Sequence, residues 1–155
     1  MSATAVETSN PISLFAALPK DWALKPLKHA VSFIEGPGIM ATDFENDGVP
    51  LLRIAGISGR MASLDGCNFL SPTLVEAKWS HFRVRSGDLL ISGSASTGLC
   101  AEVDAATIGA IPYTGIMIVR PNNVRTDKNF FRWFFLSDPF AMQVALAQTG
   151  SALKH

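Results

Sequence analysis

The chain has 155 residues, of which 48% are hydrophobic and 17% are charged, and its formal net charge at pH 7 is zero. This length suffices for one domain with its own hydrophobic core, the low charge content excludes a disordered chain, and no apolar run reaches the roughly 18 residues of a membrane span. Proteins that coat nucleic acid through charge alone are usually strongly basic, so the balanced charge counts against that class.

Residues 1–17 are predicted to form a flexible leader ahead of a single domain at residues 18–155. The leader is rich in Ala, Ser and Thr and lacks the basic start of an export signal. Cys67 and Cys100 are far apart and have no partner at zinc-ligand spacing, which predicts reduced thiols. We therefore expect a soluble, cytoplasmic protein.

In the first half of the domain, the sequence predicts short secondary-structure elements separated by turns. Residues Leu24–Ile34 predict a short amphipathic stretch, Gly36–Gly38 a break in the chain, and Asp43–Gly48 a polar surface loop. Residues Val49–Ile57 have the apolar, β-favouring content of a buried strand, which Arg53 interrupts.

The next part of the chain predicts further strands. Apolar and polar residues alternate from His81 to Val84, and Leu89–Ile91 is an apolar run that ends in the glycine-bounded loop Ser92–Gly98. More short strands are predicted at Leu99–Val103, Thr107–Ile111 and Gly115–Val119.

A helix is predicted after Asp127, whose side chain suits an N-cap. The four phenylalanines within Phe130–Phe135 lie at the spacing of a helix face that packs on a core, although aromatic rings also stack on bases. Arg132 and Trp133 are expected to lie off that face.

The end of the chain predicts a second helix. Ser137–Pro139 should end the first helix and begin another that runs through Gln148, with Gly150 as its C-terminal cap. Strands first and helices last indicate an α+β domain, with a mixed, twisted sheet of short strands followed by C-terminal helices.

Four landmarks, taken together, resemble the target-recognition domain of the DNA specificity subunit (S subunit) of type I restriction–modification systems. They occur in the family's order and span nearly all of the chain beyond the leader. They are Leu18-Pro19 followed by Trp22, Gly48–Ile54, Gly87–Ser92, and the closing Thr149–Ala152.

This resemblance implies a fold like the DNA methylase specificity domain and a protein that reads DNA without catalysis or a cofactor. In the family a full subunit carries two such domains, each reading one half of a split site. The implied partners are double-stranded DNA, a modification (methyltransferase) subunit and a restriction subunit. The sequence stops at His155, where the family's conserved helix would follow, so we expect either a truncated piece or a half-length subunit that pairs with a second half-subunit.

Candidate DNA contacts are polar side chains on loops that a sheet could present to a groove. Arginine can bind guanine through two hydrogen bonds, and Asn does the same for adenine, so the candidates for base contacts are Arg53, Arg60 and Asn68. Cations and hydroxyls position a protein on phosphates, for which the candidates are Lys78, His81, Arg83, Ser94, Ser96 and Thr97. The alternative for each residue is plain solvent exposure.

The cations outside the leader form clusters in the sequence, which leaves one basic face possible. These clusters are Lys20, Lys25 and Lys28, then Lys78, Arg83 and Arg85, then Arg120, Arg125, Lys128 and Arg132.

Two other functions stay open at this point. Asp65, Glu76 and Lys78 have the residue types with which a small magnesium-dependent nuclease holds its metal and orients water. The near-zero net charge instead favours a protein-interaction or anti-restriction module. Ser137–Phe140 resembles part of an amino-methyltransferase signature, but a helix cap explains it better.

Overall fold

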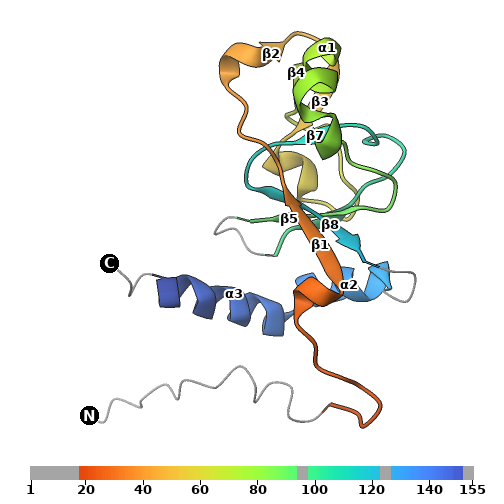
Figure 1. The fold of residues 1–155 in the computed structure, drawn as a ribbon, viewed down its shortest axis with the longest axis vertical. Helices are drawn as coiled ribbons and strands as arrows, with labels where there is room; N and C mark the ends of the chain where they lie inside the picture. Colours follow the sequence, from red (N-terminus) through yellow and green to blue (C-terminus); the bar gives the residue numbers. More distant parts are fainter. Residues whose placement is uncertain (1–17, 94–97, 123–126, 152–155) are drawn as a thin grey trace.

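The computed structural model describes residues 18–93, 98–122 and 127–151, which form two four-stranded sheets and a C-terminal pair of helices (Figure 1). The strands are β1 (Val31–Glu35), β2 (Phe44–Glu45), β3 (Val49–Leu52), β4 (Asn68–Leu70), β5 (Leu89–Ser92), β6 (Cys100–Glu102), β7 (Ile111–Pro112) and β8 (Ile116–Pro121). The helices are α1 (Pro72–Leu74), α2 (Lys128–Phe135) and α3 (Asp138–Ser151). Short turns of other helical types are η2 (Leu27–His29), η3 (Ala41–Asp43), η4 (Ile54–Ile57), η5 (Val75–Trp79) and η6 (Ser80–Phe82).

The first sheet has the order β1-β8-β5-β6, and all its neighbours are antiparallel. Its central strand β5 is buried along Leu89–Ile91, because both faces of the sheet are covered. This accounts for the uninterrupted apolar run, since successive side chains of a strand point to opposite faces.

The second sheet has the order β2-β4-β3-β7, and it is mixed. Strands β2 and β3 both pair antiparallel with β4, whereas β3 and β7 are parallel, with Leu52 opposite Pro112. Pro50 lies near the start of β3, as its missing donor requires. The predicted α+β class and the mixed sheet followed by helices are confirmed, although the strands divide between two sheets.

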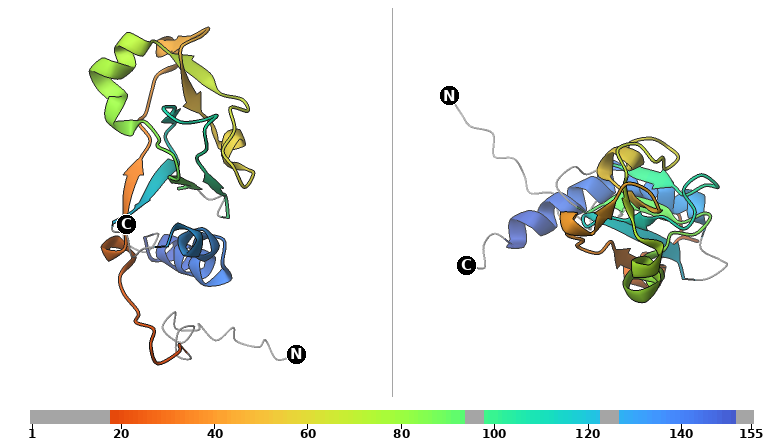
Figure 2. Two further views of the ribbon diagram at one scale, coloured as in Figure 1. Left: turned by 90° about the vertical axis from the view of Figure 1, so that its right-hand side faces the viewer. Right: turned by 90° about the horizontal axis from the view of Figure 1, so that it is seen from above.

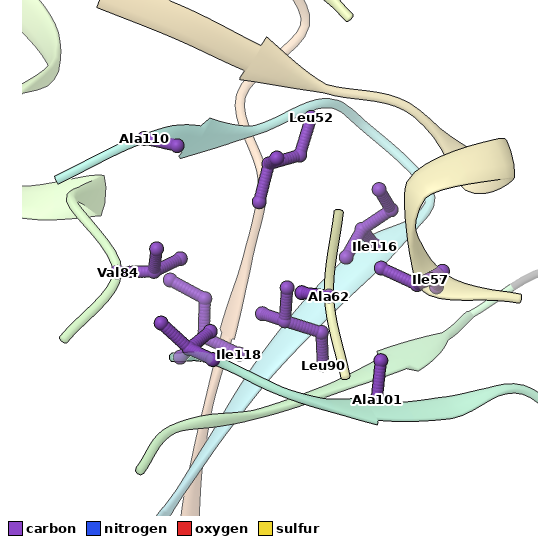
Figure 3. Packing of buried hydrophobic residues seen from close by; sticks show 10 residues of the cluster. Leu52, Ile57, Ala62, Val84, Leu90, Ala101, Ala110, Ile116 and Ile118 are labelled. Carbon is purple, nitrogen blue, oxygen red and sulfur yellow. The ribbon is translucent and has the colours of Figure 1, made fainter. Parts of the chain in front are cut away.

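One hydrophobic cluster joins the two sheets (Figure 3). Leu52 from the second sheet and Ile57 from η4 pack against Leu90 and Ile118 of the first sheet. The opposite face of the first sheet packs on α2 through a second cluster that includes Leu89, Ile91, Val119, Phe131 and Phe135.

A third cluster lies between the second sheet and the helical segment 72–82, which consists of α1, η5 and η6. Leu51, Leu70 and Val75 are fully buried in it. Because Leu51 and Leu52 point to opposite faces of β3, each face of the second sheet contributes to a different cluster. Both views in Figure 2 place this helical segment (green) and η4 (yellow) on opposite sides of this part of the molecule.

Helix α2 begins as the sequence predicted. The Asp127 side chain accepts a hydrogen bond from the Asn129 backbone N–H at 2.7 Å. Phe131 and Phe135 are buried and Trp133 is exposed, as predicted, whereas Phe130, also predicted to lie on the core face, is 46% exposed. Arg132 was wrongly expected to lie off that face, because it is only 9% exposed.

Ser137 caps α3, since its Oγ accepts from the Phe140 N–H at 3.4 Å. Gly150 lies inside this helix rather than at its cap. No helix in residues 18–93, 98–122 or 127–151 is both long and apolar enough to cross a membrane.

Three predicted elements are wrong in part. Leu24–Ile34 is not a continuous amphipathic stretch, because η2 ends at His29 and the chain then pairs with β8 as β1. The predicted strand Val49–Ile57 ends at Leu52 and continues as η4. The alternation at His81–Val84 belongs to η6 and the segment after it, where Val84 packs into the core.

Two further differences concern smaller segments. Thr107–Ile111 is a turn except at its last residue, where β7 begins. The predicted loop Asp43–Gly48 contains the short strand β2.

A buried ion pair connects the start of β5 to the end of β8, which are the two central strands of the first sheet. Asp88, which is 5% exposed and precedes β5, accepts from Arg120 Nε and Nη2, each at 2.8 Å. Asp88 Oδ2 also accepts from the Arg85 N–H at 2.8 Å, and Arg120 Nη2 donates to the Arg83 carbonyl at 3.1 Å. Both carboxylate oxygens of Asp88 therefore accept hydrogen bonds, as a buried charge requires.

Replacing Asp88 by Asn should lower the free energy of unfolding by about 2–4 kcal/mol, because Arg120 would keep its charge without a carboxylate. Urea denaturation followed by circular dichroism measures this change. The matched control is Glu76→Gln, which removes the more exposed carboxylate of the Arg83 pair and should cost less than about 1 kcal/mol. Equal losses in both variants would contradict the role given to Asp88.

The thiol of Cys100 is buried against α2, and this burial raises its pKa from 9.0 to about 11. Arg132 lowers that pKa and Glu102 raises it, but both effects are smaller than that of burial. The folded state thus holds the thiol proton more tightly than the unfolded chain does. This contribution to stability is complete below pH 9 and is lost as the pH rises toward 11.

We expect the difference in unfolding free energy between the wild type and Cys100→Ala to fall by about 2–3 kcal/mol across that pH interval. Taking the difference cancels the pH effects that the two proteins share. Urea titrations at a series of pH values measure it, and below about pH 8 the difference should be flat. A difference that stays constant up to pH 11 would show that burial does not hold the proton.

Candidate nucleic-acid interface

Strand register brings three polar or aromatic side chains to one end of the second sheet. Asn68 on β4 lies opposite Leu51 of β3, and Arg53 follows two residues after Leu51. Because β3 and β7 are parallel, Tyr113 directly follows β7 beside Arg53, and its N–H donates to the Leu52 carbonyl at 3.0 Å. Sequence positions 53, 68 and 113 thereby become neighbours.

The three side chains are in contact. The Arg53 guanidinium carbon lies 4.3 Å from the centre of the Tyr113 ring, and Arg53 Nη1 donates to Asn68 Oδ1 at 3.4 Å. Among the described residues, no carboxylate lies within ion-pair distance of Arg53. We call Arg53, Asn68 and Tyr113 the arginine site.

Tyr113 is held from several directions. Its hydroxyl donates to the Ile39 carbonyl at 3.3 Å, and its ring makes an edge contact with Phe44, with 6.5 Å between ring centroids. Gly36 passes close to the same backbone, and a Cβ at this position would lie 2.3 Å from the Pro112 carbonyl oxygen and 2.5 Å from that of Tyr113. Only glycine fits there without displacing the backbone that carries the ring.

Arg83, predicted to contact phosphate, makes three hydrogen bonds within the protein. Its Nη1 donates to the Gly109 carbonyl at 2.7 Å, and its Nε and Nη2 donate to Glu76 Oε1 at 3.2 and 2.5 Å. These bonds fix the helical segment 72–82 to the turn before β7. Arg83 thus has a structural role, and its contact with phosphate stays a prediction.

The other predicted contacts lie in separate places. Lys78 is exposed, with its Nζ 6.0 Å from the Trp79 ring centre, and His81 lies on Phe82 with 4.0 Å between ring centroids. Arg60 is exposed on the loop after η4, where its carbonyl accepts from the Glu102 N–H of β6. Ser94, Ser96 and Thr97 lie outside the described residues.

The third cation cluster of the sequence does not form a free basic patch. Arg120 is paired with Asp88, Lys128 is paired with Glu102, and Arg132 is buried with its Nε lacking a partner in the described part of the chain. Arg125 lies outside the described residues. Arg53, in contrast, keeps hydrogen-bond donors that no group in the described part of the chain uses.

The nuclease alternative needs converging carboxylates, and Glu76 is bonded to Arg83. Within residues 18–93, 98–122 and 127–151, no group of three or more His, Cys, Asp or Glu side chains could hold a metal ion. Asp65 is exposed on the loop after η4, and its N–H donates to Ser63 Oγ at 3.3 Å.

An apolar groove of about 780 Å³ lies between residues 18–30 and the C-terminal helices. Its walls include Trp22, Leu24 and Phe130, which are 55%, 61% and 46% exposed. Trp22 and Phe130 meet edge to face with their ring centroids 6.0 Å apart. Apolar side chains gathered in this way are typical of surfaces that bind another molecule.

The fold is similar to part of the HsdS subunit of type I restriction–modification systems. The HsdS subunit from Thermoanaerobacter tengcongensis matches 86% of this chain with 17% sequence identity and a TM-score of 0.58. A chain from a structure that describes complex assembly and conformational transition of the type I R-M system matches 81% of it, with 18% identity and a TM-score of 0.54. No family model and no curated protein matches the sequence.

The chain spans about a third of these two proteins, 33% and 31% of their respective lengths. The fold that the sequence landmarks implied is thus confirmed as that of one HsdS target-recognition domain. At this level of identity the likeness concerns the fold, and the roles of individual residues rest on the geometry described above.

Arg83 makes hydrogen bonds within the protein and Lys78 is exposed, so replacing them should affect stability differently. Arg83→Ala should lower the free energy of unfolding by about 1–3 kcal/mol, because it leaves the Gly109 carbonyl without its donor and Glu76 without its cation. Lys78→Ala, on the same helical segment, should change it by less than about 0.5 kcal/mol. Thermal and urea unfolding of the two variants test this, and a marginal effect of Arg83→Ala would contradict the structural role of these bonds.

Proposed function

We propose that this domain reads DNA sequence as a non-catalytic target-recognition module, contacting one half of a bipartite site. The observation that carries the proposal is the arginine site, where a guanidinium without a carboxylate partner is held on an aromatic ring at the end of a sheet. Arginine in this state can donate two hydrogen bonds to one base edge. The likeness of the fold to a third of HsdS supports the same function.

Within this proposal the candidate residues have two roles. Arg53 and Asn68 contact base edges, and Arg60 is a further candidate because it is exposed. The phosphate contacts come from Lys78, His81 and Arg83, together with Ser94, Ser96 and Thr97, and Arg83 also supports the helical segment 72–82. Phosphate contacts place a protein on the duplex without selecting a sequence.

A second part of the proposal concerns partners. Methyl transfer and cleavage would come from a modification subunit and a restriction subunit, and a second half-subunit would supply the other half of the site. The apolar groove beside Trp22 favours assembly with another protein chain, which is also the requirement of the protein-interaction alternative.

Arg53→Ala should weaken binding by about 1–3 kcal/mol on a duplex with the preferred base and have little effect once that base is changed. Lys78→Ala should weaken binding to every duplex alike and reduce the slope of log affinity against log salt by about 1. Fluorescence anisotropy with a matched duplex and single-base variants, found by selection from a random library, measures both effects.

Identical profiles for the two variants would contradict this division of roles. A wild-type chain that binds all duplexes equally would contradict the proposed function. Incubating the wild type with plasmid and magnesium tests the nuclease alternative in parallel, since nicking would require a catalytic site.

A further inference from the structure

Arg53 does not simply extend into solvent, because its guanidinium lies on an aromatic ring that other residues hold in place. The cation lies on the Tyr113 ring at 4.3 Å, and the ring is itself fixed by its hydroxyl bond to the Ile39 carbonyl and by its contact with Phe44. A flexible surface arginine would lose side-chain entropy on binding. An arginine already stacked on a fixed ring loses less of it.

The hydrogen-bond donors of Arg53 are only partly used. Arginine has five N–H donors in a planar fork, and the structure shows one bond, from Nη1 to Asn68 Oδ1 at 3.4 Å. The Nε–Nη2 edge has no acceptor among the described residues. Two parallel N–H groups match the O6 and N7 acceptors of guanine in the major groove.

We propose that Tyr113 is a positioning residue, which holds the plane of Arg53 so that its free edge reads one guanine of the target. Tyr113 acts through Arg53 and makes no base contact of its own. This inference rests on the proposed function, because it names the base read at the same site. A phosphate also accepts two hydrogen bonds from arginine, so the test separates a base contact from a backbone contact.

The test is selection of bound duplexes from a library with a randomised segment, using the 155-residue chain at low salt. The wild type should enrich guanine at one position that depends on Arg53. Arg53→Lys keeps the charge but loses the planar fork, so we expect the preference for guanine there to fall about tenfold while preferences at other positions persist.

Tyr113→Leu should produce the same loss at the same position, although Arg53 is intact. Tyr113→Phe is the matched control, because it keeps the ring under the guanidinium and removes only the hydroxyl bond to Ile39. It should retain most of the guanine preference. Urea unfolding of all variants identifies loss of folding, and Arg53→Lys keeps the test decisive if Tyr113→Leu does not fold.

Each outcome has a distinct meaning. If Arg53→Lys leaves the guanine preference intact, or if either variant lowers affinity evenly for all sequences, Arg53 contacts the backbone and the inference is wrong while the proposed function stands. If Tyr113→Leu folds and keeps the preference that Arg53→Lys loses, Tyr113 has no positioning role. If the wild type shows no preference at any position, the proposed function itself fails.

Discussion

The buried pair of Asp88 and Arg120 is the interaction that fixes the end of the first sheet at which the chain arrives from the helical segment 72–82. It connects the start of β5 to the end of β8, and its remaining hydrogen bonds fix the backbone at Arg83 and Arg85. That backbone leads from the helical segment 72–82 into the first sheet. A change in the pair would therefore be transmitted to the helical cover of the second sheet.

The second sheet is a support for the arginine site more than an independent unit. Its strands are short, and β2 and β7 have two residues each, so the sheet depends on the clusters that cover its two faces. The parallel pairing of β3 with β7 places Arg53 and Tyr113 side by side at the end where both strands stop.

Local signals in the sequence predicted much of the first sheet and the C-terminal helices. The apolar run at Leu89–Ile91 predicts a buried strand and Asp127 predicts a helix start, and each prediction needs only a few neighbouring residues. The wrong predictions come from interactions across the chain. Val31–Glu35 is a strand because β8, far along the sequence, pairs with it, and the alternation at His81–Val84 reflects packing and the Arg83 bonds rather than a strand.

The candidate site shows the same division. Residue type alone selected Arg53 and Asn68, and the antiparallel register of β3 and β4 then placed them together. Tyr113 was missed because its role requires the parallel pairing of β3 and β7, for which the sequence carries no local signal. It is the only tyrosine in the chain and directly precedes a turn, which marks it as unusual without assigning a partner.

Gly36 extends the requirements of the arginine site to a residue that is not part of that site. Any side chain at this position would collide with the backbone at Pro112 and Tyr113. The Tyr113 ring therefore keeps its position only while residue 36 is glycine. Related chains could exchange Arg53 or Asn68 without disturbing this backbone, yet would have to retain the glycine. Distant relatives that share the geometry should therefore be traceable by a glycine just after their first strand, even where Arg53 and Asn68 have diverged.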